Sequence, residues 1–314
     1  MLLNAILKRL LATLPVLFGV ALFVFSLLYV IPGDPAALIA GDTATPEEIA
    51  RIRSTLGLDR SFWVRFAEWL LQILHGELGT SIFSGMSVSH LIGQRLGPTL
   101  SLMSLTLVVA IVVAVPLGVL AAWKQGTVLD RLTMMGAVFG FSVPVFVVGY
   151  LLAYVFAVEL SWLPVQGYRP LSDGVWEWLR HLILPSVALG GIYIALIARI
   201  TRTAMLEVLS QDYVRTAKAK GLGQTTILFR HALKNAAVPV VTVIGIGVAL
   251  LIGGAVATES VFSIPGLGRL TVDAILRRDY PIIQGVILFF SMVYLLVNLV
   301  VDMLYVILDP RIRY

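Results

Sequence analysis

Six long apolar stretches without a run of charge dominate this sequence, and they decide which folds are open to it. They comprise residues 10–30, 99–122, 133–158, 181–198, 236–257 and 283–307. Together they cover 136 of the 314 residues but hold only one of the 41 charged side chains, Asp302. A bilayer core about 30 Å thick needs roughly 20 apolar residues per helical crossing, and a charge inside it is costly. We therefore predict an all-α, polytopic membrane protein with six transmembrane helices.

The composition excludes several classes of function. The chain has no cysteine, which excludes disulfides, thiolate metal sites and a cysteine nucleophile. Its four histidines are scattered, no serine in a span has a histidine partner in mid-membrane, and no lysine follows a glycine as a P-loop requires. The basic residues, which give a net charge of +5, form no aromatic-interleaved patch typical of nucleic-acid binding. We expect no catalytic residue, no metal site and no nucleic-acid partner.

The distribution of basic residues predicts how the chain is oriented. If the N-terminus is inside, the inner segments total 63 residues with 13 Lys and Arg, whereas the outer segments total 115 residues with 10. Basic residues concentrate on the cytoplasmic side of membrane proteins. We therefore predict that both termini are cytoplasmic, and that the first span is a retained helix because no small-residue cleavage site follows it.

The outer segment 31–98 is too long for a simple connector, so we expect it to fold as a small helical extracytoplasmic insertion. A Pro-Gly-Asp-Pro turn at 32–35 ends the first span. Thr45 precedes Pro46 and two acids, which predicts a helix start, and that helix runs to about Leu56. Residues 62–74 carry apolar side chains at helical spacing and predict a second, amphipathic helix. The insertion is either a lid packed on the bundle, which the spacing favours, or a surface for an outside partner.

The inner segment 199–235 has seven basic and two acidic side chains and no proline. Ser210 is placed to cap a helix over residues 213–220, Gly221 to end it, and residues 225–234 to form a second helix. A basic helix resting on anionic lipid is the alternative. Ala217, Ala219 and Gly221 favour a protein partner instead, because such small residues offer little apolar area to a membrane and permit close approach by another backbone.

The fifth span is rich in glycine. Its glycines at the centre and outer end are Gly245, Gly247, Gly253 and Gly254. Such residues either line a pore or allow close packing between helices, and packing is the commoner cause. Asp302 stands one turn after Asn298, and a hydrogen-bonded pair is favoured there over ion coupling.

Several motifs in a fixed order resemble one family. The cytoplasmic segments DYVRTAKAKGL (212–222) and RHALKNA (230–236) resemble the loop of importer-type ABC transporter permeases, and more narrowly the dipeptide, oligopeptide and nickel permeases. The wider pattern of that loop aligns through Ala217, Gly221 and Leu233, whereas Arg215 and Thr216 stand where it has Glu-Ala. Further similarity lies in PGDPA (32–36), LGLD (56–59), HGELGTS (75–81), ESVFSIPGLGR (259–269), RDYP (278–281) and DPRIRY (309–314).

The resemblance implies a division of labour among subunits. The chain would pair with a second, homologous permease, receive one or two cytoplasmic ATP-binding subunits and meet an extracytoplasmic solute-binding protein. ATP and Mg would be bound by the ATPase subunits, with no cofactor on this chain, which contacts membrane lipid. The implied ATPase-docking loop comprises Tyr213, Arg215, Thr216, Ala217, Lys218, Gly221 and Leu222. The candidate extracytoplasmic partner surface comprises His75, Gly76, Glu77, Glu259, Phe262 and Pro265.

Our primary hypothesis is the permease subunit of an ATP-driven importer in a bacterial inner membrane. Its regions would be the first span (1–30), the insertion (31–98) and a five-helix core (99–314) with the coupling loop 199–235. The solute would be a di- or oligopeptide or a similar small compound such as glutathione, an opine or a nickel chelate. An autonomous channel or secondary transporter is the alternative, and a membrane enzyme is disfavoured because no catalytic constellation is present.

Overall fold

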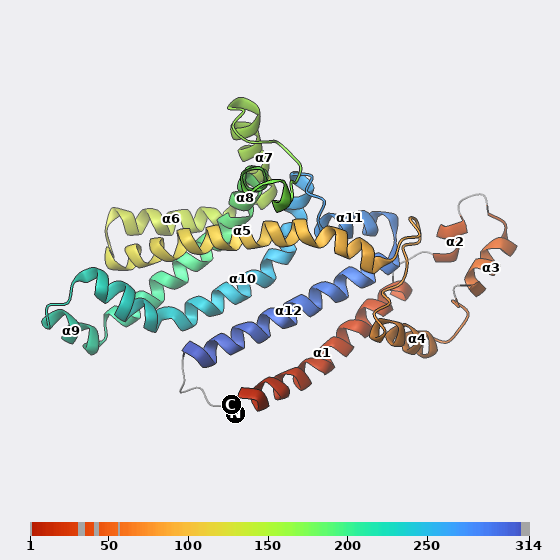
Figure 1. The fold of residues 1–314 in the computed structure, drawn as a ribbon, viewed down its shortest axis with the longest axis horizontal. Helices are drawn as coiled ribbons and strands as arrows, with labels where there is room; N and C mark the ends of the chain where they lie inside the picture. The colour runs from red at the N-terminus through yellow and green to blue at the C-terminus, as the bar shows by residue number, and fades with distance from the viewer. Residues whose placement is uncertain (1, 31–34, 41–43, 56, 309–314) are drawn as a thin grey trace. The chain divides into compact units, whose positions relative to one another are not determined.

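The computed structural model describes residues 2–30, 35–40, 44–55 and 57–308, and most of this part of the chain is helical (Figure 1). The N-terminal helices are α1 (Leu2–Val30), α2 (Pro35–Ala40), α3 (Pro46–Thr55), α4 (Phe62–Leu74) and α5 (Val88–Trp123). The middle of the chain forms α6 (Val128–Ser142), α7 (Val145–Leu152), the π-helix η1 (Ala153–Glu159), the short 3-10 turn η2 (Leu171–Asp173) and α8 (Val175–Leu209). Then come α9 (Asp212–Ala219), the π-helix η3 (Thr226–Ala232), α10 (Leu233–Val261), α11 (Leu267–Arg277) and α12 (Tyr280–Leu308). The predicted all-α class is confirmed, and within the described ranges the one β-bridge joins Thr80 to Ser87.

The predicted spans coincide with the long apolar helices. Five helical segments are long and apolar enough to cross a membrane: Leu11–Val30, Val88–Trp123, Val175–Leu209, Thr226–Val261 and Tyr280–Leu304. A sixth crossing is present if the pair Val128–Ser142 and Val145–Glu159, bent by 103°, counts as one span.

The third predicted span was wrong in one respect, because residues 133–158 do not form one continuous helix. α6 ends at Ser142, Val143 is extended (φ −98°, ψ 124°), and Pro144 is the N-cap of α7. The pyrrolidine ring disfavours helical geometry in the residue before it, and here the chain leaves the helix at Val143 and restarts after Pro144. The apolar pattern continues through the break, which is why hydropathy alone does not reveal it.

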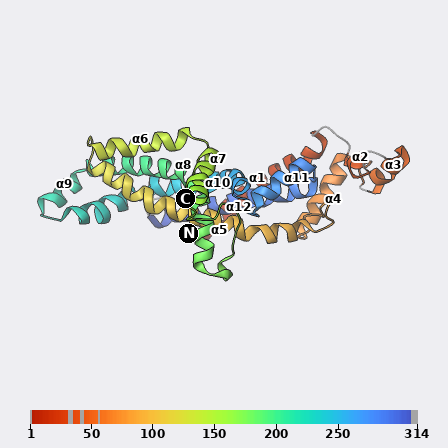
Figure 2. The same cartoon turned by 90° about the horizontal axis from the view of Figure 1, so that it is seen from above.

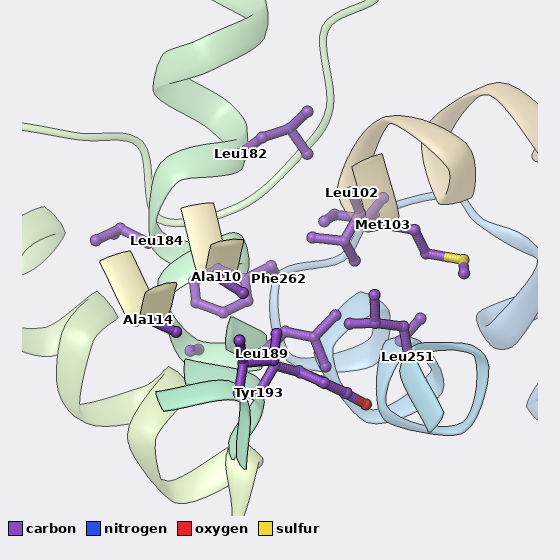
Figure 3. Packing of buried hydrophobic residues seen from close by; sticks show 14 of the residues in the cluster. Leu102, Met103, Ala110, Ala114, Leu182, Leu184, Leu189, Tyr193, Leu251 and Phe262 are labelled. Atoms are coloured by element: carbon purple, nitrogen blue, oxygen red, sulfur yellow. The ribbon is translucent and has the colours of Figure 1, made fainter. Parts of the chain in front are cut away.

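The described chain divides into two compact units, of which the larger comprises residues 95–270 and 296–314. Its centre is α8, which packs against α6, α7 and α10, and Figure 2 shows α6 running alongside α8. Leu102, Leu189, Leu251 and Phe262 are buried together in its apolar core (Figure 3). α8 is therefore the central helix of this unit.

The smaller unit comprises residues 1–94 and 271–295. In it α4 lies on α1 through Phe66, which is buried against Ala21 and Phe25. The Phe25 and Phe66 rings meet edge-on at 5.4 Å between centroids, a favourable aromatic geometry. The predicted helix 62–74 is confirmed at both ends, and its apolar face is covered by the first span as a lid would be.

The predicted helix start at Thr45 is also confirmed. The Thr45 backbone N–H donates to Glu48 Oε2 at 2.8 Å, and the Glu48 N–H donates to Thr45 Oγ1 at 3.3 Å. This reciprocal pair is a capping box, and its hydrogen bonds hold the pKa of the Glu48 carboxyl below its ordinary value. The predicted turn at residues 32–34, the helix end at Leu56 and the motif at 309–314 lie outside the described residues.

Candidate functional site

The helix α9 forms the tip of the segment between the α8 span and the span that begins at Thr226. It spans Asp212–Ala219, one residue earlier at each end than the predicted 213–220, and its N-cap is Gln211 (φ −72°, ψ 149°) rather than Ser210. Ser210 instead ends α8, where its hydroxyl donates to the Glu207 carbonyl at 2.7 Å. Asp212 in the first turn and Lys218 in the last turn both complement the helix dipole.

Gly221 ends α9 as the sequence predicts. Its φ is +78°, and its N–H donates to the Lys218 carbonyl at 3.0 Å while the Leu222 N–H donates to the Ala217 carbonyl at 3.3 Å. These two bonds form a Schellman motif, which requires the left-handed conformation that glycine adopts without steric cost. A Cβ at Gly221 would meet no atom within 4 Å, so the position demands glycine for its backbone conformation.

One face of α9 is buried and the other is open. Val214 and Ala217 pack with Ile227 of η3, and Val208 and Leu209 of α8 lie against them. The predicted docking residues on the open face are Tyr213, Arg215, Thr216, Lys218, Gly221 and Leu222, all of them exposed. Ala217 is a correction to that set, because its methyl group is covered by the chain itself and is only 8% exposed.

The second predicted inner helix, 225–234, exists as η3 and the start of α10. The chain runs from Thr226 to Val261 without a break, so η3 connects α9 directly to the fifth span. The wider turn of a π-helix places Ile227 and Leu228 in the interior and leaves Arg230 exposed. Arg215, Lys218, Lys220 and Arg230 give the exposed part of this loop a net positive charge. The arrangement suits contact with an acidic or polar protein surface.

An ion pair that sequence analysis missed fixes the C-terminal part of α8. Arg202 Nε donates to Asp130 Oδ1 at 2.5 Å and a terminal nitrogen of Arg202 donates to Asp130 Oδ2 at 2.8 Å. The Gly126 N–H donates to Asp130 Oδ2 at 2.9 Å, which ties the α5–α6 turn to the same carboxylate. Bidentate Arg–carboxylate pairs are strong and directional. An acid close to basic residues in the short connection between two predicted spans was the signal, but its partner is 72 residues away.

The glycines of α10 have two different surroundings. A Cβ at Gly245 would overlap the Val301 side chain, and one at Gly247 would lie 3.3 Å from the Tyr193 ring. A Cβ at Gly254 would lie 2.7 Å from Leu189, whereas one at Gly253 would meet nothing within 4 Å. Three of the four glycines therefore allow neighbouring helices to approach, as small residues do in membrane proteins.

The motif at 259–269 forms a loop closed by a buried carboxylate. Glu259 is fully buried and accepts hydrogen bonds from the Thr99 hydroxyl at 2.6 Å and from the Arg269 N–H at 3.0 Å. The Thr99 oxygen in turn accepts the Leu267 N–H at 2.8 Å. Gly266 and Gly268 lie so close to the Glu259 carboxylate that a Cβ at either would overlap it.

This loop corrects the expected partner surface. Glu259 and Phe262 are buried within the larger unit, at 0% and 2% exposure, so they hold the loop together and are not presented outward. Pro265 is partly exposed. His75, Gly76 and Glu77 lie exposed after α4 in the smaller unit and remain a candidate contact surface.

The described residues contain no cluster of side chains suited to bind a metal ion. Within the described ranges, no three His, Cys, Asp or Glu side chains come close enough to hold a metal ion. The Glu259 carboxylate, which is the most buried acid, is committed to hydroxyl and backbone donors.

Comparison with known proteins gives one consistent family. Residues 114–314 match the family of binding-protein-dependent transport system inner membrane components, and residues 2–103 match its N-terminal region. A probable peptide ABC transporter permease of Sinorhizobium fredii is 54% identical over 98% of this chain and 99% of its own. The glutathione transport system permease GsiC of Salmonella typhimurium is 45% identical over 99% of each chain. The dipeptide permease DppB of Alkalihalophilus pseudofirmus is 41% identical over 98% of each.

A solved structure shares the fold. A chain of the MetNI methionine ABC transporter superposes with a TM-score of 0.59 at 18% identity, over 70% of this chain and 97% of that one. At this identity the likeness concerns the fold alone. The family models and the relatives cover nearly the whole chain, and the shared fold covers 70% of it.

Proposed function

Because this chain belongs to the family of binding-protein-dependent transport system inner membrane components, it is a multi-pass permease subunit of an ABC importer, and we propose that α9 couples its spans to ATP hydrolysis by a separate subunit. The observation that carries the proposal is the exposed, basic and firmly capped helix between two spans. A short helix held by a Schellman motif and by Val214 moves as one body with the helices that flank it. A push on its open face is therefore delivered to α8 and α10.

The proposed partners follow from this role. One or two ATP-binding subunits would carry ATP and Mg, a second permease would complete the pathway, and a binding protein would deliver solute from outside. Movement of α9 would then switch the bundle between two discrete states, as in other two-state membrane switches. This chain supplies the path and the docking surface, while the ATPase supplies the energy.

We place the protein in the inner membrane of a bacterium with both termini in the cytoplasm. The basic-residue asymmetry supports this orientation, and it puts α9 on the side where ATP is available. The same orientation puts α4 and residues 75–77 outside, on the side of a binding protein.

We propose short peptides or peptide-like compounds as the solute. Relatives named as peptide, dipeptide and glutathione permeases support this class, since they match almost end to end. The other solutes considered from the sequence, opines and nickel chelates, are not named among these relatives.

Uptake into proteoliposomes tests the function directly. Vesicles containing both permeases, the ATPase subunits and the binding protein should accumulate a labelled dipeptide only when ATP and Mg are present on the ATPase side. Vesicles that lack the ATPase subunits should show no accumulation. Equal transport with and without the ATPase would overturn the proposal and favour an autonomous channel.

A further inference from the structure

The smaller unit contains a cavity of about 520 Å³. One wall is a face of α4, with Arg65, Trp69 and Gln72 at helical spacing, and the facing wall is formed by residues 78–82 and the start of α12. Its volume falls within the range of sites that bind small ligands, roughly 300–1,000 Å³. All its lining residues belong to this one unit.

Arg65 brings a positive charge to the cavity. The guanidinium donates to the Tyr29 hydroxyl at 2.6 Å and lies over the Tyr29 and Phe25 rings at 5.4 and 5.8 Å, so α1 holds it in place. No carboxylate pairs with Arg65 in the described part of the chain, because the nearby Glu68 accepts its ion pair from Arg60 at 2.6 Å. A fixed guanidinium with unused donors is suited to bind a carboxylate.

Thr80 brings one unpaired backbone N–H and one unpaired C=O to the cavity lining. The bonds on either side of it, Val88 N–H to the Gly79 carbonyl at 3.0 Å and Ser81 N–H to the Met86 carbonyl at 2.9 Å, make Thr80 and Ser87 a non-hydrogen-bonded pair. In such a pair the N–H and C=O point away from the partner strand. Among the described residues they have no partner, and a free extended edge of this kind recognises another extended chain.

The rest of the lining is mixed, because polar side chains stand beside the apolar ones. Glu68 pairs with Arg60, the Ser81 hydroxyl donates to Asp279, and the Gln284 amide donates to the Val24 carbonyl. Trp69, Leu78, Ile82 and Pro281 supply the apolar surface. The buried Tyr280 hydroxyl has no hydrogen-bond partner within the described ranges.

We propose that this cavity binds a short peptide in extended conformation. The C-terminal carboxylate lies on Arg65, the main chain runs along Thr80, and an apolar side chain packs beside Trp69. The inference rests on the proposed function, because it takes a peptide importer as given. It adds to that function a peptide-binding site on the permease, separate from the binding protein.

Equilibrium dialysis on the complete transporter tests the site, with neither ATP nor binding protein present. The probes are the labelled tripeptide Ala-Leu-Phe and its C-terminal amide. The acid should bind saturably and more tightly than the amide. Arg65→Gln should weaken binding of the acid by about tenfold, the usual effect of losing a charge-assisted hydrogen bond, and leave binding of the amide unchanged. Retained amide binding shows that the cavity is intact in the variant.

A matched pair on α4 tests the apolar contact. Trp69→Leu should weaken binding of both probes, whereas Trp63→Leu, whose side chain is 66% exposed and outside the cavity lining, should have no effect. The proposal is overturned if neither probe binds saturably, or if Arg65→Gln weakens acid and amide equally. It is also overturned if the tripeptide does not bind but Arg65→Gln weakens binding of the purified binding protein, because the cavity is then a protein-docking site.

The two proposals fail in different measurements. Absent tripeptide binding together with normal ATP-driven uptake overturns the cavity site alone. Normal tripeptide binding together with ATP-independent transport overturns the proposed function alone.

Discussion

At the residue scale, Gly221 is a conformational requirement. A Cβ added at Gly221 would meet no neighbouring atom, but the φ of this residue is +78°. A larger residue is therefore disfavoured here only by the backbone conformation. The left-handed conformation costs an ordinary residue about 1–2 kcal/mol, and more for a β-branched one. We predict that Gly221→Val loosens the end of α9 and lowers the affinity for the ATPase subunit by about tenfold or more, with a matching loss of ATP-dependent uptake. The measurement is ATPase binding to permease in nanodiscs.

Two variants separate the cap from a general effect of added bulk. Gly223→Val adds the same side chain two residues away, where φ is not positive and no atom lies within 4 Å, and should leave docking unchanged. Gly221→Asn should retain most of the affinity, because asparagine tolerates the left-handed conformation. An equal loss in both valine variants would mean that the loop surface, not the cap, determines docking.

At the element scale, the glycines of α10 decide how closely the helices pack. A methyl group at Gly245 would overlap Val301, whose branched side chain has little freedom to move, whereas one at Gly253 meets open space. We predict that Gly245→Ala destabilises the folded protein by about 1–3 kcal/mol, the usual cost of overpacking. Gly253→Ala should leave the unfolding midpoint in detergent unchanged or slightly higher, since alanine favours helix. Loss of transport in Gly253→Ala at unchanged stability would instead indicate that this glycine lines the pathway.

At the scale of the whole molecule, the orientation across the membrane decides which partner each surface meets. The chain has no cysteine, so single cysteines report on it directly. Arg215→Cys suits the inner side because that side chain is 75% exposed. Ser84→Cys suits the outer side, since it is exposed and close in size, whereas Arg65 is engaged with Tyr29. In intact spheroplasts an impermeant thiol reagent should label position 84 but not position 215.

Permeabilised spheroplasts provide the control for this labelling, because both positions should then react. Labelling of position 215 alone in intact spheroplasts would show that the orientation is opposite to the one predicted. The proposed role of α9 in ATPase docking would be lost with it.

Sequence patterns were sufficient to predict the all-α class, the membrane helices apart from the break at Val143, and the local helix signals. Charge depletion located the membrane helices because lipid penalises charge wherever the chain folds. The capping box at Thr45, the helix 62–74 and the positive φ of Gly221 were predictable because each depends on neighbours within a few residues.

Tertiary structure alone decided what lies between distant residues. The pairing of Asp130 with Arg202, the burial of Glu259 on Thr99 and the covering of Ala217 by Ile227 join segments that no local pattern relates. A buried carboxylate and an exposed one have the same letter in the sequence, and the difference arises only when hydroxyl and backbone donors are brought around it. The cavity beside Arg65 arises in the same way, from α1, α4, residues 78–82 and α12 packing together, because the shape of a site is a property of contacts and not of composition.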